Sequence, residues 1–332
     1  MVTRKDVAQH AGVSPATVSN VINNKDIVGD RMRGRVLESI EKLGYKPNMV
    51  ARSLKTKETK QIALISNDIS NPYYAQVALG MEEEARKSGY VVCMLNASAD
   101  GDYADELLKR QFDGVILATD KLSVDKINTL AAMNVPVVFI GNEGYCDLDK
   151  RVTQAHLGTY DGACSLFTHL IHGGHRRIGF ICPRILKDFE EPDFRLKAYK
   201  DILTANKIAF DPALIFIEGQ SLEYSYDATS ALIKTDDRPT AIFCGNDNLA
   251  LAAISAIHDA GLRVPEDISV AGFDNVMTSR FFYPPLTTVD MPKYELGQTS
   301  MVLLLRKIKG ETVDDIRLKT KLIIRKSTAS VL

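Results

Sequence analysis

Hydrophobic residues in the first sixty positions recur at the three- and four-residue spacing of short amphipathic helices. The first helix is expected over 4–11, and Gly12 is expected to end it. Ser14 and Pro15 predict the start of a second helix, because serine caps a helix and proline suits its first position. A third helix is expected over 31–43. The N-terminal part of the chain is therefore predicted to be a small all-α domain.

From residue 61 the pattern changes to short, nearly continuous apolar runs with helical segments between them. The runs are predicted to be buried strands, at 62–66, 91–95, 114–118, 135–140, 178–182, 214–217, 241–244 and 268–273. Helices are expected between them, for example over 74–88 and 122–133. This alternation is typical of parallel sheets that helices cover on both faces. The fold class expected is therefore α/β, and the length of the body predicts two lobes, each with a doubly wound parallel sheet.

Charge divides the chain at the same point. Residues 1–60 hold 12 Lys/Arg and 6 Asp/Glu, whereas the remaining residues hold 29 Lys/Arg and 36 Asp/Glu. A short basic module joined to an acidic body predicts a polyanion partner for the module, and the alternative is a solvated basic tail. The chain has no run of 18 apolar residues and no apolar signal segment, so we expect a cytoplasmic protein without a membrane partner. Five scattered cysteines without a C-x-x-C pair indicate a reducing compartment.

The first two predicted helices have the layout of a helix-turn-helix. Small Ala8 allows the helices to approach closely, and Gly12 permits the tight turn between them. The second helix would expose short side chains that fit a DNA major groove, namely Pro15, Ala16, Thr17, Ser19 and Asn20. Any small three-helix bundle could show this spacing, but the basic charge of the segment favours DNA binding.

Ordered motifs along the whole chain support a family relationship. At the N-terminus they are DVA (6–8), AGVS (11–14), TVS (17–19), VIN (21–23), LGY (43–45) and ARSL (51–54). In the body they are ISNDISNPYYAQV, FDGVIL, GHRRIGFI, RPTAIFCGND, GLRVPEDISVAGFDN and PPLTTVDMP. Together they resemble the lactose-repressor (LacI/GalR) family of bacterial transcription regulators. The resemblance implies an all-α headpiece followed by a two-lobed body similar to the periplasmic sugar-binding proteins.

The resemblance also implies where the domains lie. The expected parts are a helix-turn-helix headpiece (1–46), a hinge helix with a linker (47–60) and an effector-binding, dimerising body (61–332). Three crossovers would join the lobes, near 158–162, 288–292 and 318–321. The N-lobe would comprise 61–160 and 291–320, and the C-lobe 161–289 and 321–332.

A set of DNA contacts follows from the same resemblance. The expected residues are Thr3, Ser14, Pro15, Ala16, Thr17, Ser19, Asn20, Asn23, Arg52, Leu54 and Lys55. Pro15, Ala16 and Asn20 match base-reading positions, and Leu54 matches the leucine that wedges into the minor groove at the operator centre. A buried core position is the alternative for Leu54. Many members carry arginine where this chain has Asn20, so its operator sequence should differ.

Polar residues follow the predicted strands of the body at their carboxyl ends, where ligands of such folds bind. The expected effector-binding residues are Asp68, Asn71, Tyr73, Tyr74, Arg195, Asn246, Asp247 and Asp274. Carboxylate and amide groups beside aromatic rings suit a hydroxylated or heteroaromatic small molecule. The resemblance implies effector contacts at four of them, Tyr73, Arg195, Asn246 and Asp274. Each could instead be a cap or turn residue, and Asp247 is an equally good candidate for a helix N-cap.

Several positions depart from the family pattern. Gly141 stands where many sugar-responsive members carry aspartate, and segment 156–162 lacks their Asp-Asn pair. Loop 219–224 does not clearly keep the aromatic residue that several members stack on the ligand. These departures weigh against a simple sugar and favour a phosphorylated or unusual effector, and the alternative is ordinary sequence drift in a sugar-responsive member. The effector is therefore left open between a sugar, a sugar phosphate and a similar small molecule.

Other chemistry finds little support in the sequence. His169, His172 and His175 invite a metal site, but a Gly-Gly pair ends the helix there and no acidic or thiol partner stands at ligand spacing. No Walker motif and no G-x-S-x-G elbow is present. We expect no metal, no cofactor and no enzymatic activity.

These observations predict a homodimeric repressor that binds pseudo-palindromic operator DNA and is controlled by a small-molecule effector between its lobes. The alternative is a small-molecule-binding protein that shares the body fold without regulating DNA. An enzyme built on the same scaffold is a third possibility. The choice between inducer and corepressor stays open.

Overall fold

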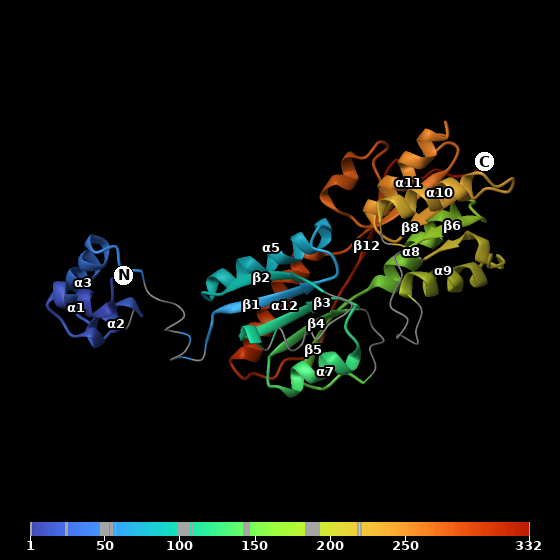
Figure 1. The fold of residues 1–332 in the computed structure, drawn as a ribbon. Coiled ribbons are helices and arrows are strands. Elements are labelled where there is room, and N and C mark those ends of the chain that lie inside the picture. The colour runs from blue at the N-terminus through green and yellow to red at the C-terminus, as the bar shows by residue number, and fades with distance from the viewer. Residues whose placement is uncertain are drawn as a thin grey trace. The chain divides into compact units, whose positions relative to one another are not determined.

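The computed structural model describes most of the chain, as two compact units (Figure 1). The described residues are 2–23, 26–46, 53, 56, 58–97, 107, 109–141, 147–182, 193–217, 219 and 221–331. The N-terminal unit spans residues 1–59, and the body spans residues 60–332.

The N-terminal unit contains the helices α1 (Arg4–Ala11), α2 (Pro15–Ile22) and α3 (Asp30–Lys42), which pack against one another. The three helices predicted from the sequence are confirmed. Their apolar faces enclose a small core, made of Val7, Ala8, Ala11, Val18, Val21, Val28, Val36 and Tyr45. A core of this size buries little apolar surface, so the bonds at the helix ends matter for stability.

Caps and a closed turn hold the N-terminal unit together. Thr3 and Asp6 form a capping box on α1, in which the Thr3 N–H donates to the Asp6 carboxylate at 2.7 Å. Gly12 ends α1 in the left-handed conformation, with φ of 63°. A side chain at Gly12 would also collide with the Arg35 guanidinium, which donates to the Ala11 carbonyl. The turn between α1 and α2 is therefore closed by a residue of α3.

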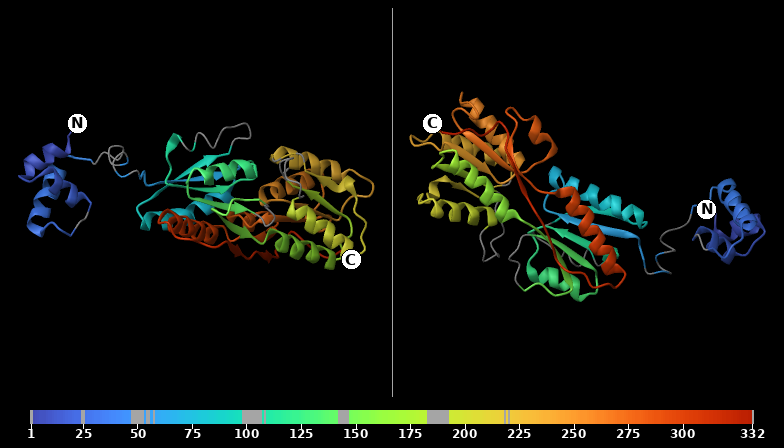
Figure 2. Two further views of the ribbon diagram at one scale, coloured as in Figure 1. Left: turned by 90° about the horizontal axis from the view of Figure 1, so that it is seen from below. Right: turned by 180° about the vertical axis from the view of Figure 1, so that it is seen from behind.

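The first sheet of the body has six parallel strands in the order β11-β5-β4-β3-β1-β2. They are β1 (Gln61–Ser66), β2 (Val91–Asn96), β3 (Gly114–Ala118), β4 (Val137–Gly141), β5 (Val152–Leu157) and β11 (Ile316–Leu318). Helices α5 (Pro72–Lys87) and α12 (Lys293–Ile308) cover one face, and α7 (Val124–Ala132) covers the other (Figure 2). Alternate residues of β1 point to opposite faces of the sheet, since Ile62 packs towards α5 and Ala63 packs towards α7.

The second sheet also has six strands, in the order β12-β10-β9-β8-β6-β7. They are β6 (Ile178–Ile181), β7 (Ile215–Phe216), β8 (Ala241–Cys244), β9 (Ser269–Asp274), β10 (Thr287–Asp290) and β12 (Lys321–Ile323). The helices of this lobe are α8 (Thr159–His172), α9 (Phe194–Ala205), α10 (Leu222–Ile233) and α11 (Asp247–Asp259), with short 3₁₀ helices η1 (Pro212–Leu214) and η2 (Met277–Phe281). Helices α8 and α9 share one core with the sheet, and α10 and α11 share another. This arrangement is doubly wound, as predicted.

The chain passes between the two sheets three times, after Leu157, after Asp290 and after Leu318. The second passage leads from β10 into α12, so a helix late in the sequence covers the first sheet. The third passage joins β11 to β12 directly. Each sheet is consequently completed by a segment that is distant in sequence.

Four strands were missing from the sequence prediction, and each has a physical reason. β5 alternates polar Gln154 and His156 with apolar residues, so it lacks a continuous apolar run. β10 begins with two threonines, and β11 and β12 have three residues each. The predicted parallel sheets are confirmed, with an exception at one edge of the second sheet, where β12 pairs antiparallel with β10. An edge strand that arrives without a crossover helix can pair in this direction.

Helices α5 and α12 cross at a pair of glycines. A Cβ atom at Gly80 would collide with the Tyr294 carbonyl oxygen, and one at Gly297 would collide with the Val77 carbonyl oxygen. The two backbones therefore touch directly, each helix presenting its glycine to the other's peptide groups. Backbone contact of this kind fixes the distance and the position of one helix along the other.

Replacing Gly80 with alanine should lower the free energy of unfolding of the body by about 1–3 kcal/mol, because the added methyl forces the helices apart. Urea unfolding followed by circular dichroism measures the change. Gly34→Ala is the matched control, since Gly34 lies in α3 and a Cβ atom added to it would meet no other atom within 4 Å. That substitution should be neutral or stabilising. Unchanged stability of Gly80→Ala would refute the backbone contact.

Candidate functional site

Five of the eleven residues predicted to contact DNA lie along one stripe of α2 and its C-cap residue. Pro15, Ala16 and Asn23 are exposed, and Ser19 and Asn20 are half-buried. These positions recur at helical spacing, so they share the face opposite the buried valines of the helix. The stripe consists of short amide, hydroxyl and apolar groups that can reach base edges in a major groove.

The hydroxyl groups of three predicted DNA contacts are engaged within the headpiece. Ser14 caps α2, since its hydroxyl accepts from the Thr17 N–H at 3.1 Å and lies 2.9 Å from the Thr17 hydroxyl. Thr3 caps α1. Their first role is thus to orient the helix ends. Another group of predicted contacts, Arg52, Leu54 and Lys55, lies outside the described residues.

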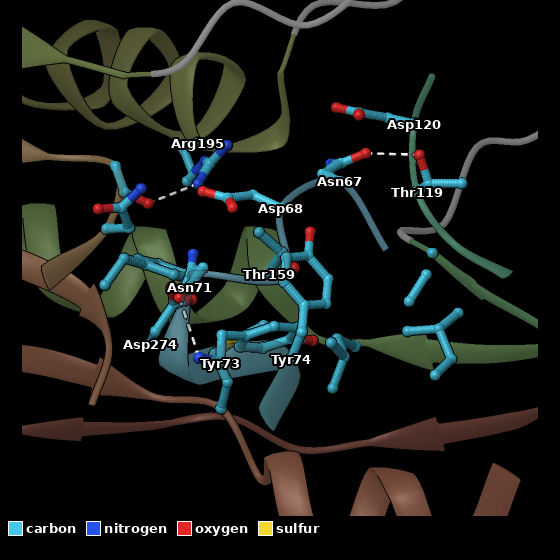
Figure 3. A pocket seen from close by; sticks show the side chains of 18 residues that line it. Asn67, Asp68, Asn71, Tyr73, Tyr74, Thr119, Asp120, Thr159, Arg195 and Asp274 are labelled. Carbon is cyan, nitrogen blue, oxygen red and sulfur yellow. Dashed lines mark hydrogen bonds between the residues drawn. The ribbon is translucent and has the colours of Figure 1, made fainter. Parts of the chain in front are cut away.

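The body contains a cavity of about 230 Å³ where the carboxyl ends of strands from both sheets meet (Figure 3). Its lining is Asn67, Asp68, Asn71, Tyr73, Tyr74, Ala118, Thr119, Asp120, Ile140, Gly141, Leu157, Thr159, Arg195, Gly245, Asn246, Phe273, Asp274 and Met291. Seven of the eight predicted effector residues are in this lining, and they are Asp68, Asn71, Tyr73, Tyr74, Arg195, Asn246 and Asp274. The first four come from the N-lobe and the other three from the C-lobe.

Arg195, in the first turn of α9, supplies the positive charge of the C-lobe wall. Its Nε donates to the Asp193 carboxylate at 2.9 Å, and its two terminal nitrogens donate to Asp193 and to the Gly245 carbonyl, at 2.5 and 2.6 Å. The guanidinium also lies 5.8 Å from the centre of the Phe273 ring. Burial would raise the pKa of Asp193, but the Arg195 charge and hydrogen bonds hold it below its usual value. Both groups of the pair are therefore ionised at neutral pH.

Asp274 enters the cavity from a strained strand end. Its φ is 102°, and that of Asn275 is 51°, both in the region that favours glycine. The Lys293 ammonium group donates to the carbonyls of Asp274, of Asn275 at 3.2 Å and of Met291 at 2.9 Å. Lys293 thereby stabilises this backbone conformation and ties β9 to the second passage between the lobes.

The Asp274 carboxyl is surrounded by groups that disfavour its charge. Burial and the nearby Asp247 raise the pKa of Asp274 to about 8. A carboxyl group with this pKa is mostly protonated at neutral pH, and it can donate a hydrogen bond as well as accept one. Burial and Asp274 also raise the pKa of Tyr73 well above its usual value, so Tyr73 stays a phenol. Its ring meets that of Tyr74 edge to face, with 5.0 Å between centres.

Asp247 is the predicted effector residue that the structure places elsewhere, and its assignment to the cavity wall is corrected. Its side chain is fully buried, and both carboxyl oxygens accept hydrogen bonds. The Thr288 hydroxyl donates to Oδ1 at 2.6 Å, and the Val276 N–H donates to Oδ2 at 2.7 Å. Burial raises its pKa to about 7. The N-cap of α11 is the neighbouring Asn246, whose side chain accepts from the Leu249 N–H at 2.9 Å. Asp247 is a structural residue beneath the cavity.

Three polar residues of the N-lobe wall were not predicted from the sequence, namely Asn67, Thr119 and Asp120. The Thr119 hydroxyl donates to Asn67 Oδ1 at 2.5 Å, and the Lys121 ammonium group donates to the Asn67 carbonyl at 2.8 Å. Burial raises the pKa of Asp120. Thr119 and Asp120 directly follow β3, so the strand-end rule that found Asp68 could have found them as well.

The histidines considered as a metal site anchor the C-terminal segment. His175 lies 2.9 Å from both the Thr240 hydroxyl and the Ala329 carbonyl, and His169 lies 3.2 Å from the Thr328 hydroxyl. Within the described ranges, no three His, Cys, Asp or Glu side chains gather as metal ligands would. No helix in the same ranges combines the length and apolar character that crossing a bilayer requires.

A helix-turn-helix and an interlobe cavity in one chain define a class of protein, the ligand-responsive DNA-binding regulators. Residues 3–48 match the family described as bacterial regulatory proteins, lacI family, and residues 167–328 match the periplasmic binding protein-like domain. The HTH-type transcriptional repressor PurR of Mannheimia succiniciproducens is 34% identical over 337 residues, covering 100% of both chains. The chain therefore belongs to the LacI family.

Other relatives and solved structures agree with this assignment. Catabolite control protein A of Priestia megaterium is 34% identical, over 98% of this chain and 99% of its own. The lac repressor dimer bound to operator and the anti-inducer ONPF is 30% identical, with a TM-score of 0.83 and 99% of each chain covered. A LacI family regulator of Enterococcus faecium with bound ribose is 29% identical, with a TM-score of 0.71, covering 82% of this chain and 100% of its own.

The raised pKa of Asp274 predicts a pH dependence of stability. The folded protein keeps the Asp274 proton up to about pH 8, whereas the unfolded chain releases it near 3.8. This contribution to stability is therefore complete below about pH 3.8, falls as the pH rises above that value, and is fully lost above about pH 8. Asp274→Asn keeps a neutral side chain at all pH values, so it should remove this part of the loss.

Urea unfolding at pH 6 and pH 8.5 measures the effect. The wild type should lose roughly 1 kcal/mol or more relative to Asp274→Asn over this interval. Asp227→Asn, at an exposed position on α10, is the control and should follow the wild type. Identical pH profiles for the wild type and Asp274→Asn would contradict the buried, protonated carboxyl.

Proposed function

We propose that this protein is a dimeric repressor that binds pseudo-palindromic operator DNA through α2 and responds to a small, neutral, hydroxyl-rich effector in the interlobe cavity. The observation that carries the proposal is the composition of the cavity wall. Residues of both lobes form this wall, and seven of them, in strand-end loops and at helix starts, make it polar. The lac repressor structure with its operator and anti-inducer supports the same pairing of two sites.

The chemistry of the cavity supports the effector class. Its amide and carboxyl groups can exchange hydrogen bonds with hydroxyl groups, and the Tyr73 and Tyr74 rings offer apolar faces. A volume of about 230 Å³ favours a ligand the size of a monosaccharide. Solved relatives hold cellobiose or ribose, which are both neutral and rich in hydroxyl groups. The carboxyl groups of Asp68, Asp120 and Asp274 disfavour a negatively charged ligand such as a sugar phosphate, which was an alternative from the sequence.

An effector that touches both walls would favour one orientation of the lobes. Tyr73 and Tyr74 belong to the N-lobe, and Arg195 and Asp274 belong to the C-lobe. The ligand changes DNA affinity only by its differential affinity for the two orientations, typically about 1–3 kcal/mol. We propose that segment 48–55 forms a hinge helix that carries this change to DNA, with Leu54 as the minor-groove wedge and Arg52 and Lys55 near phosphates. Inducer and corepressor differ only in which orientation binds the operator.

Exposed apolar residues of the C-lobe support a dimer surface. Leu251, Met277, Phe281 and Tyr283 are 41%, 62%, 73% and 88% exposed, and they lie on α11, on η2 and just after it. Large apolar groups clustered on a protein surface are favourable to cover. We propose that a second copy of the chain covers them and that the paired headpieces read two half-sites.

The remaining parts of the proposal concern location and catalysis. We propose that the protein acts in the cytoplasm, where it meets DNA, and that it has no enzymatic activity. The relatives that support this are named repressors and a control protein.

Selection of bound duplexes from a random library tests the regulator function directly. The full chain is used at two salt concentrations, with and without a mixture of neutral sugars. We expect an enriched palindrome of two half-sites, bound with a steep salt dependence. Recovery of no enriched sequence under any of these conditions would overturn the proposal in favour of a binding protein without DNA regulation.

Asn20→Ala should weaken binding to the selected operator by about tenfold or more, because base contacts specify sequence. Binding to random DNA should change little, since phosphate contacts dominate there. Fluorescence anisotropy with both duplexes measures the two affinities. Gln9→Ala, at an exposed position of α1, is the control and should leave both affinities unchanged. Equal losses of Asn20→Ala on the two duplexes would exclude a base-reading role.

A further inference from the structure

Asp193 forms an ion pair with the positively charged group that an anionic ligand of the cavity would need. Of the described residues that line the cavity, Arg195 is the one with a positive charge. The Asp193 carboxylate binds this guanidinium through both oxygens, with Nε–Oδ1 at 2.9 Å and one terminal nitrogen to Oδ2 at 2.5 Å. This side-by-side geometry is the one with which arginine binds a phosphate or a carboxylate of a ligand.

The pair is held in place and shielded from water. The side chains of Arg195 and Asp193 are 18% and 11% exposed. Asp193 also accepts from the Arg195 backbone N–H at 2.7 Å, as the N-cap of α9. The third anchor is the Gly245 carbonyl. A buried ion pair with several hydrogen bonds does not open easily for a competing anion, because each separated charge would lose its partner.

The rest of the cavity wall offers an anion no other charge of the right sign. Asp68, Asp120 and Asp274 are the other ionisable acids of the described lining, and any charge they carry is negative. Hydrogen bonds to described residues use three of the five N–H groups of the guanidinium, which leaves two for a neutral acceptor such as a hydroxyl or ring oxygen.

We propose that Asp193 is a specificity-determining residue, which makes the cavity accept neutral, hydroxyl-rich ligands and reject phosphorylated or carboxylated ones. The inference rests on the proposed function only in treating the cavity as the effector site. Asp193 acts through Arg195, as a positioning and charge-compensating residue. The bare cap of α9 would require no charge, since serine or asparagine serves equally well as an N-cap.

The test uses inorganic phosphate as the probe, titrated into the full chain by calorimetry at constant ionic strength. Asp193→Asn keeps the cap and removes the charge, so it should bind phosphate at least about tenfold more tightly than the wild type. The double variant Asp193→Asn/Arg195→Gln should lose this gain, which locates the bound anion at Arg195. Asp201→Asn is the matched control, because Asp201 is a carboxylate of the same helix that pairs with Lys197 outside the cavity lining.

Two results would overturn the proposal: no gain in a folded Asp193→Asn variant, or the same gain in the double variant. Thermal unfolding shows whether each variant is folded, and Asp193→Ser, which is also a neutral cap, replaces Asp193→Asn if that variant is not. The experiment needs neither the natural effector nor the operator. A failure here leaves the operator selection untouched, and a failure of the selection leaves the phosphate result standing.

Discussion

Parallel strands impose the constraint on which this structure depends. All strands of a parallel sheet run the same way, so the loops that leave their carboxyl ends gather along a single edge. Three passages of the chain join two such sheets, and the two loop-rich edges face each other. Residues from segment 67–74 on one edge and from segment 245–246 on the other line the same cavity for this reason. The polarity of the cavity is thus a consequence of topology.

Buried charges around the cavity are satisfied by the protein itself. Lys293 has three backbone carbonyls, Arg195 has a carboxylate and a carbonyl, and Asp247 has a hydroxyl and an N–H group. Burying an ion without such partners costs several kcal/mol, so each group fixes its neighbours as well as itself. The donors and acceptors that remain for a ligand are therefore set before it binds.

The sequence predicted the architecture and most of the cavity wall, and the exceptions have physical causes. Residues after strands such as β1 and β9 could be placed because a continuous apolar run ends at a recognisable position. Asn246 and Asp247 are adjacent polar residues, and only the start of α11 decides which of them faces the cavity. Asp193 does not directly follow a strand predicted from the sequence and shows no periodicity, so its contact with Arg195 emerged only from the structure. Strands β5 and β10 were missed because polar residues interrupt their apolar runs, and because their edge partners β11 and β12 are distant in sequence.

The glycine crossing of α5 and α12 gives the body a mechanical property. The two helices are in backbone contact at Gly80 and Gly297, so they resist sliding past each other and should move as one rigid unit along the first sheet. Helix α12 begins at Lys293, at a passage between the lobes, and the first turn of α5 contains the cavity tyrosines Tyr73 and Tyr74. Rotation of one of these helices should therefore move the other. Movement of one lobe relative to the other should then take place mainly in the three short connections between them.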